Sequence, residues 1–201
     1  NVDFNKVNLA DYGKHENYMG RQIHRWTKQY KDSETQMIPE INELIEWLPK
    51  NIPSDQETSI VHGDFRLDNM IFDPITHEVK AILDWELSTL GNPIADFTYH
   101  MMSWRLPAGA KGLGMMGSDL KSLNIPSESE YAELYYKKTG REKIDNWDFY
   151  MAYNIFRLAG IAQGIVGRVR DGTASSSEAK NYEAFVPILG KLGWSIVEGI
   201  K

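Results

Sequence analysis

The sequence predicts an α+β fold in which several helices surround a small β insert. Apolar residues recur at helical spacing over residues 15–32 and again over 146–170. Between these stretches, residues 58–84 contain three short apolar runs separated by turn-forming residues, a pattern typical of strands. With 201 residues, of which 42% are hydrophobic and 25% are charged, the chain is long enough for one sizeable domain or two small ones.

The first two predicted elements are amphipathic helices. The apolar face of the helix over 15–32 is formed by Met19, Ile23, Trp26 and Tyr30. Ser33 or Thr35 is expected to begin a second helix with Pro39 in its first turn, because hydroxyl side chains favour N-caps and proline is tolerated early in a helix. The apolar face of this second helix is formed by Ile41, Leu44, Ile45 and Leu48, and the run Pro53-Ser54-Asp55 ends it.

The β insert follows. Short strands are predicted at Ser59–Val61, Met70–Phe72 and Val79–Leu83. The residues Asp73–His77 predict a turn between the last two strands. Polar residues therefore follow the strand ends on loops, which is where rigid scaffolds commonly present chemical groups.

Helices return in the second half of the chain. They are predicted over residues 94–104, 128–138, 146–170 and 178–199. Gly140 is expected to stop the second of these helices, and the third is apolar over a broad face, which indicates burial. Four glycines within residues 107–119 predict a mobile loop, and Thr173–Ser177 predicts a linker. No repeat or domain boundary is visible.

The composition argues against several classes of function. A formal net charge of -6 and a pI of about 5.4 argue against nucleic-acid binding, which usually requires a basic patch. No apolar run is long enough to cross a bilayer, and the first residues do not form a signal peptide. Because cysteine is absent, disulfides and thiolate sites are excluded, and a cytoplasmic location without membrane attachment is expected.

The strongest chemical pattern is the run His62–Asn69, followed by Asp84 after the third predicted strand. Asp64 is able to accept the proton of a substrate hydroxyl, Asn69 offers a neutral oxygen to a hard cation, and Asp84 adds a charged oxygen. Phosphoryl transfer requires an oriented hydroxyl, neutralised phosphate charge and in-line geometry. The spacing therefore predicts a phosphoryl-transfer site that uses Mg²⁺ and ATP.

Three further residues lie inside the same run. His62 is expected to brace the loop through hydrogen bonds. Gly63 is expected to allow a backbone conformation that residues with a Cβ atom rarely adopt. Arg66 either neutralises Asp64 or faces the substrate, and the sequence alone does not separate these two roles.

The remaining polar and aromatic residues of the motif have weaker signals. Asp68 is expected to be a surface or capping carboxylate rather than a ligand. Glu86 is either a further partner of the metal or a support for its loop. Trp85 is expected to belong to the core, because a large aromatic side chain is more often packed than presented to a ligand.

These motifs resemble the aminoglycoside phosphotransferase family, which is sometimes grouped with the choline kinases. The stretches that carry the resemblance are His62–Asn69, Ile82–Glu86 and Gly91–Asp96. One branch is closer still, namely the phosphotransferase-like domains related to those fused to acyl-CoA dehydrogenases in animals. That closer similarity lies in Trp26–Tyr30, His62–Asn69, Leu83–Thr89 and Ala159–Gly164. The resemblance covers essentially the whole chain.

The resemblance implies roles for the motif residues and a class of substrate. It implies that Asp64 is the catalytic base, that Asn69 and Asp84 are magnesium ligands, and that Asp96 is a buried structural aspartate. The implied substrate is a small hydroxylated molecule such as a hydroxyacyl-CoA or a hydroxy acid, rather than an antibiotic. This step rests on analogy with the family, because a fold is not specific to one substrate.

The resemblance further implies that residues 1–201 form a protein-kinase-like C-terminal lobe, with the catalytic loop over 58–86 and a helical substrate region over 94–200. The glycine-rich loop, strand lysine and helix glutamate of the N-terminal nucleotide-binding lobe are not found in the sequence. Little kinase activity is therefore expected from these residues alone. The acceptor pocket is expected to draw on Tyr99, His100, Trp104 and Arg157, the last because a buried cation needs a partner.

Two other functions stay open at this point. One is a non-catalytic kinase-like module that binds a ligand or partner, which the intact Asp64, Asn69 and Asp84 argue against. The other is a metal-dependent hydrolase that uses His62, Asp64 and Asp84. That function would require more imidazole or thiolate ligands than the motif offers, because the chain has 5 His and no Cys.

Overall fold

The computed structural model of the chain describes residues 2–54, 57–109, 114–173 and 181–200. The chain divides into two compact units, each assembled from two separate stretches of sequence. Unit 1 contains residues 1–15 and 57–145, and unit 2 contains residues 16–56 and 146–201. None of the helices in the described ranges is both long and apolar enough to cross a membrane.

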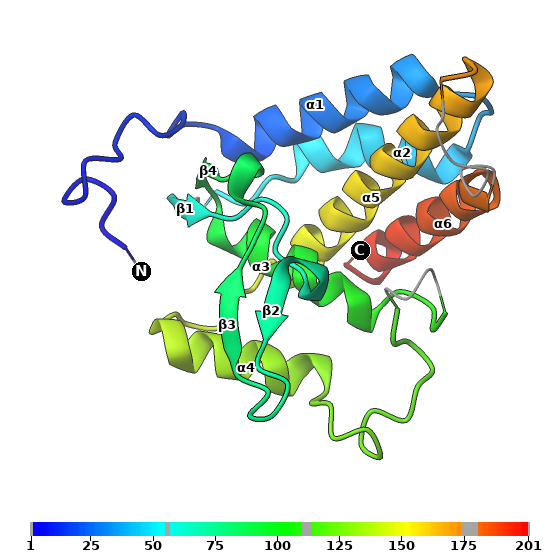
Figure 1. Ribbon diagram of the computed structural model, residues 1–201. Coiled ribbons are helices and arrows are strands. Elements are labelled where there is room, and N and C mark those ends of the chain that lie inside the picture. Colours follow the sequence, from blue (N-terminus) through cyan, green and yellow to red (C-terminus); the bar gives the residue numbers. More distant parts are fainter. Residues whose placement is uncertain (1, 55–56, 110–113, 174–180, 201) are drawn as a thin grey trace. The chain divides into compact units, whose positions relative to one another are not determined.

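In the residues of unit 2 that the structure describes, all regular elements are helices (Figure 1). Its elements are α1 (Tyr18–Ser33), α2 (Pro39–Trp47), the short 3-10 helix η1 (Leu48–Lys50), α5 (Trp147–Arg170) and α6 (Tyr182–Ile200). Helix α5 packs against both α1 and α6, and α6 also packs against α2. The approach of α6 is close, because a Cβ atom on Gly193 would lie 2.9 Å from a methyl group of Leu44. As predicted, α5 is almost completely buried from Phe149 to Gly160.

The predicted start of the second helix at Ser33 or Thr35 is wrong. Helix α2 begins at Pro39, and neither hydroxyl caps it. Ser33 is instead the last residue of α1, and its hydroxyl donates to the carbonyl of Gln29 at 2.7 Å. The Thr35 hydroxyl accepts a hydrogen bond from the Gln163 amide at 3.2 Å, so the connection between the helices is fastened to α5.

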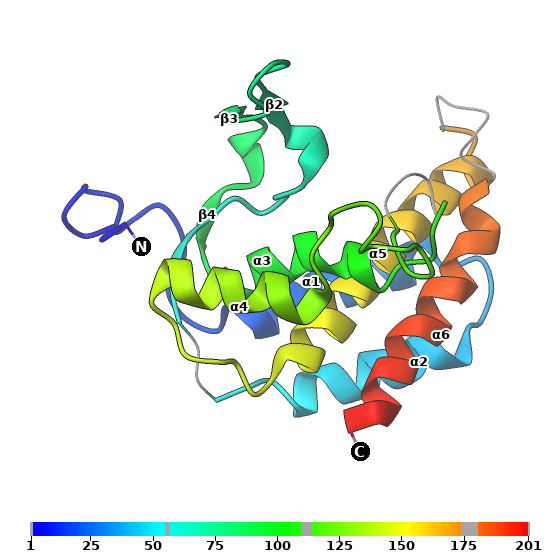
Figure 2. The ribbon, with the colours of Figure 1, turned by 90° about the horizontal axis from the view of Figure 1, so that it is seen from below.

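Unit 1 contains two small antiparallel sheets. Strand β1 (Ser59–Val61) pairs with β4 (Thr89–Gly91), and Ile60 lies opposite Leu90. Strand β2 (Met70–Phe72) pairs with β3 (Val79–Ile82), and Met70 lies opposite Ile82. The predicted turn at 73–77 joins the latter two strands. Figure 2 shows this β2–β3 hairpin projecting away from the helices of the same unit.

The α-helices of unit 1 begin at clear capping residues. Helix α3 (Pro93–Met101) begins after Asn92, whose side chain accepts hydrogen bonds from the amides of Ile94 and Ala95, both at 2.9 Å. It continues into the 3-10 helix η4 (Met102–Trp104). Helix α4 (Glu128–Thr139) begins with a capping box at Ser127 and ends at Gly140, as predicted.

Residues 110–113 of the glycine-rich segment, residues 174–177 of the predicted linker and the predicted start of the last helix at 178 lie outside the described residues. On either side of residues 110–113, Pro107 and Met116 form an isolated parallel bridge. The described part of the last helix begins at Tyr182.

Candidate active site

The hairpin register determines where the two predicted metal ligands lie. The carbonyl of Asn69 accepts a hydrogen bond from the Leu83 amide at 2.8 Å, which extends the β2–β3 pairing by one step beyond Met70 and Ile82. Asn69 therefore ends the 3-10 helix η2 (Leu67–Asn69) directly opposite the residue that precedes Asp84. The amide and the carboxylate are thus brought to the same end of one hairpin, although 15 positions separate them in the sequence.

Asn69 is also bonded to the predicted base. Its side-chain nitrogen donates to the main-chain carbonyl of Asp64 at 2.8 Å and to the carboxylate oxygen Oδ2 of Asp64 at 3.0 Å. These bonds use the nitrogen side of the amide and leave its oxygen as the group able to bind a cation. One oxygen of the Asp64 carboxylate is held in the same way, and the half-buried Asp64 still has Oδ1 to accept a proton.

His62 connects the loop to the end of β3. Its Nδ1 accepts a hydrogen bond from the amide of Asp64 at 3.2 Å, so the ring proton lies on Nε2, which donates to the carbonyl of Leu83 at 2.8 Å. The imidazole is buried, with 4% of its surface exposed. His62 therefore sets the position of the Asp64 backbone and does not face a substrate.

The carboxylate of Asp96, in the first turn of α3, holds the same loop from the other side. Its two oxygens accept hydrogen bonds from the amides of His62 and Gly63, each at 2.8 Å. Charge-assisted bonds of this kind are stronger than bonds between neutral groups. A single side chain of α3 thus fixes the two residues that precede the predicted base.

Gly63 is required by its conformation and by its surroundings. Its φ is +86°, and a Cβ atom there would lie 2.5 Å from the carbonyl oxygen of Leu87. Gly140 has a similar φ of +70°, but nothing lies within 4 Å of the corresponding position. A side chain at position 140 would therefore meet backbone strain alone, whereas a side chain at position 63 would meet strain and a collision with the Leu87 carbonyl.

We expect Gly63→Ala to lower the free energy of unfolding by about 2–5 kcal/mol, through left-handed strain and overpacking together. Gly140→Ala, which adds strain alone, is expected to lower it by only about 1–2 kcal/mol. Urea denaturation followed by circular dichroism measures both variants. Equal losses would contradict the account, because they would mean that the Leu87 carbonyl moves aside without cost.

Arg66 forms its ion pair with Asp68 and not with Asp64. Asp68 lies in η2, and 65% of its side chain is exposed, so it is a surface carboxylate with a charged partner. The Arg66 side chain is one-third exposed. Its Nε atom is buried and has no hydrogen-bond partner among the residues that the structure describes.

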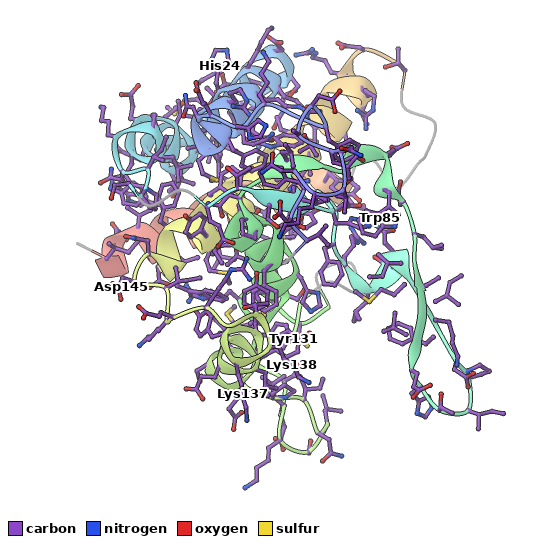
Figure 3. All side chains as sticks on the ribbon, turned by 90° about the vertical axis from the view of Figure 1, so that its left-hand side faces the viewer. His24, Trp85, Tyr131, Lys137, Lys138 and Asp145 are labelled. Atoms are coloured by element: carbon purple, nitrogen blue, oxygen red, sulfur yellow. The ribbon has the colours of Figure 1, made fainter. Side chains whose placement is uncertain are left out.

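The expectation that Trp85 belongs to the core is wrong. Trp85 begins the 3-10 helix η3 (Trp85–Leu87), and 49% of its surface is exposed (Figure 3). Its indole nitrogen donates to the carbonyl of Ile82 at 2.8 Å, and its ring lies 4.7 Å from that of His62. Asp84, just before it, has the left-handed torsions φ 63° and ψ 55°, a conformation that is uncommon outside glycine. Such strain is concentrated at functional sites.

The donor set fits Mg²⁺ better than zinc. Within the described ranges no group of three or more His, Cys, Asp or Glu side chains is arranged to hold a metal ion. Asn69 and Asp84 supply one amide oxygen and one carboxylate, and Glu86, two residues further on, is exposed. Mg²⁺ binds through one or two carboxylates, waters and substrate phosphates, whereas zinc sites use three or four nitrogen or sulfur ligands.

The predicted acceptor residues fall into both units. Tyr99, His100 and Trp104 belong to unit 1, as does Asp64, whereas Arg157 belongs to unit 2. Tyr99 and His100 are buried, and burial lowers the pKa of His100 below its ordinary value, so its ring is neutral at pH 7. Arg157 is also buried, and its guanidinium lies 5.3 Å from the ring centre of Trp26.

An aromatic chain that the sequence did not reveal leads away from the catalytic loop. Phe65, next to Asp64, lies 5.7 Å from the ring of His100, and that ring lies 5.7 Å from the ring of Tyr131 on α4. Tyr131 stacks on Trp104 at 5.1 Å. The spacing of Tyr131 and Tyr135 on one face of α4 was the available signal, but it did not indicate which rings they would meet.

Comparisons with known proteins agree with this fold. A profile described as the phosphotransferase enzyme family matches residues 1–134. A crystal structure of a candidate aminoglycoside phosphotransferase from Ralstonia eutropha aligns with a TM-score of 0.93 and 50% identity, over 98% of this chain and 60% of that one. The likeness confirms the predicted kinase-like α+β architecture.

Two longer proteins also resemble the chain. Acyl-CoA dehydrogenase family member 10 of Mus musculus is 45% identical over 194 residues, which cover 96% of this chain and 18% of that protein. Acyl-CoA dehydrogenase family member 11 of Homo sapiens is 38% identical over 194 residues, which cover 96% of this chain and 25% of that protein. The chain therefore spans a quarter or less of these relatives.

Proposed function

Because the chain belongs to the phosphotransferase enzyme family, we propose that the full-length protein transfers the γ-phosphoryl group of ATP to a hydroxyl group of a small molecule, with Mg²⁺. The observation that supports the proposal is that Asn69, which is bonded to the Asp64 carboxylate, lies at the same end of the β2–β3 hairpin as Asp84. Family membership supports the class of reaction. The nucleotide, the metal and the acceptor are parts of the proposal.

Asp64 acts as the base in this proposal. The acceptor oxygen forms a bond to the γ-phosphorus, the bond from that phosphorus to the β–γ bridging oxygen breaks, and the hydroxyl proton passes to the Asp64 carboxylate. The hydrogen bond from Asn69 to Oδ2 supports this role, because it orients the carboxylate before the acceptor arrives. His62 and Asp96 act as positioning residues through the backbone of the loop.

Asn69 and Asp84 hold the metal in this proposal, and Glu86 is a third candidate ligand. When bound, Mg²⁺ neutralises phosphate charge as it develops. We expect Asp84→Asn to raise the Mg²⁺ concentration for half-maximal activity more than about 10-fold. Replacing a residue that only hydrogen-bonds to a metal ligand already lowers metal affinity by about 10-fold or more, and Asp84 is a proposed ligand itself. Glu86→Gln is expected to have a smaller effect. Titration of activity with MgCl₂ measures both, and an unchanged midpoint for Asp84→Asn would contradict the assignment.

The acceptor is proposed to be a small hydroxylated molecule, such as a hydroxyacyl-CoA or a hydroxy acid. The names of the longer relatives, which are acyl-CoA dehydrogenase family members, support this choice over an antibiotic. Tyr99 and Trp104 are the proposed acceptor contacts in unit 1. Arg157, in unit 2, stays a separate prediction, as does a cytoplasmic location.

The proposal is tested by measuring ADP formation by the full-length protein with and without a panel of hydroxy acids and hydroxyacyl-CoA esters. We expect ADP release that requires both Mg²⁺ and an acceptor. Nucleotide binding without turnover would favour a non-catalytic ligand-binding module. Hydrolysis of a hydroxyacyl-CoA ester that requires zinc and releases no ADP would favour a hydrolase.

A further inference from the structure

Within the described residues, the ion pair with Asp68 does not use every hydrogen-bond donor of the Arg66 guanidinium. The guanidinium follows the proposed base by two residues, and its Nε is buried with no hydrogen-bond partner in the described part of the chain. A guanidinium offers five donors in a fixed fork, and a buried donor without a partner is unfavourable. The unused donor therefore indicates that an acceptor atom outside the described residues completes the site.

The ion pair with Asp68 is easily exchanged. Asp68 has 65% of its side chain in solvent, and Arg66 has 33%. Exposed ion pairs contribute little to stability, because water screens them and two flexible side chains must be ordered. A ligand carboxylate that pairs with both Nε and a terminal nitrogen would gain a bidentate contact, which is stronger than a contact through one nitrogen.

The surroundings of Arg66 favour its charged form. Burial disfavours the charged form, but the hydrogen bond to Asp68 and the nearby Tyr99 and Asp64 raise the pKa of Arg66 above its ordinary value. Arg66 also follows Asp64 by two residues in the same loop. An anion bound at Arg66 would therefore lie next to the loop segment that carries the base.

We propose that Arg66 determines specificity by binding an oxyanion beside the base, and that this oxyanion displaces Asp68. The inference rests on the proposed function and narrows its substrate class: the acceptor is a hydroxy acid whose hydroxyl meets Asp64 and whose carboxylate meets Arg66. The oxyanion that Arg66 binds has a second possible source, an oxygen of the phosphoryl group that is being transferred. If the oxyanion is the carboxylate of the acceptor, Arg66 acts only on acceptors with a negative charge. If it is a phosphoryl oxygen, Arg66 acts on charged and neutral acceptors alike.

The test compares two acceptors that differ only in that charge, β-hydroxybutyrate and its neutral carboxamide, in steady-state kinetics with the full-length protein. We expect Arg66→Gln to raise KM for the acid by about 10- to 100-fold, the worth of hydrogen bonds to a charged group, and to leave KM for the amide within about 2-fold. Arg66→Lys, which keeps the charge but loses the fork, is expected to be intermediate.

Two further variants distinguish ligand binding from a structural role. Asp68→Asn removes the competing carboxylate and is expected to lower KM for the acid by about 2- to 5-fold, the scale of an exposed ion pair. The matched control is Arg170→Gln in unit 2, since Arg170 forms a similarly exposed pair with Asp171 at 2.8 Å. It is expected to change neither KM nor kcat.

The outcomes separate the possibilities. Equal losses with the acid and the amide would assign the oxyanion to the phosphoryl group and overturn the hydroxy-acid assignment. An Arg66→Gln variant that behaves like Arg170→Gln, or an Asp68→Asn variant with a raised KM, would overturn the anion site itself. Calorimetric titration with β-hydroxybutyrate alone keeps the proposals distinguishable: binding that Asp68→Asn strengthens would uphold the anion site even if no phosphate is transferred.

Discussion

Asp64→Asn is expected to reduce kcat of the full-length protein by about 10²- to 10⁴-fold, the usual contribution of a positioned general base. The asparagine side chain has nearly the same shape, and its carbonyl oxygen still accepts the hydrogen bond from Asn69. It is no longer able to accept the proton of the substrate hydroxyl. The loss therefore lies in the chemical step rather than in the fold. Steady-state kinetics with saturating ATP and acceptor measure it.

Asp32→Asn serves as the control for Asp64→Asn. Asp32 is an exposed carboxylate of α1 that pairs with Lys28, so its replacement is expected to leave kcat unchanged. Melting temperatures of both variants should stay within about 3 °C of wild type, because Asp32 is a surface residue and an amide at position 64 keeps the shape and the hydrogen bond of the half-buried carboxylate. Full activity of a folded Asp64→Asn variant would contradict the assignment of the base.

Asp96→Ala is expected to lower stability and activity together. It leaves the amides of His62 and Gly63 without their 2.8 Å acceptors, and each unsatisfied buried amide costs about 1–3 kcal/mol, so the free energy of unfolding should fall by about 2–6 kcal/mol. The released loop also displaces Asp64, and a misplacement of about 1 Å is enough for a 10²-fold loss of kcat. Urea denaturation and steady-state kinetics measure the two effects.

Asp96→Asn is the matched comparison for Asp96→Ala. Asparagine retains one carbonyl oxygen and so keeps one of the two bonds, which predicts intermediate losses of both stability and kcat. If Asp96→Ala lowered stability while kcat stayed at the wild-type value, the loop would not depend on this carboxylate for its catalytic geometry. That result would leave Asp96 as a structural residue only.

Local sequence patterns predicted most of the elements. The four apolar positions of α1, the broad apolar surface of α5 and Gly140 after α4 are local signals, and each was confirmed. The family indicated by the motifs is confirmed by the profile match and by the solved structure. Strand β4 was missed because Thr89–Gly91 is short and becomes a strand only by pairing with β1, which lies far away in the sequence.

The sequence indicated the residue types of the candidate site but not their contacts. The order of Asp64, Asn69 and Asp84 indicated the chemistry, whereas the register that brings Asn69 and Asp84 to one end of the hairpin depends on pairing between β2 and β3. The exposure of Trp85 and the pairing of Arg66 with Asp68 also depend on three-dimensional surroundings. Composition could not reveal the two units, because each combines distant segments.

The central claim is that the full-length protein forms a phosphate ester on a small hydroxylated acceptor. ³¹P NMR of the protein with Mg²⁺, ATP and a hydroxy acid tests it directly, because phosphate esters and inorganic phosphate have separate resonances. The account predicts a phosphomonoester resonance that grows in step with ADP and is absent with Asp64→Asn. ADP that accumulates only together with inorganic phosphate, at the same rate in both proteins, would contradict it.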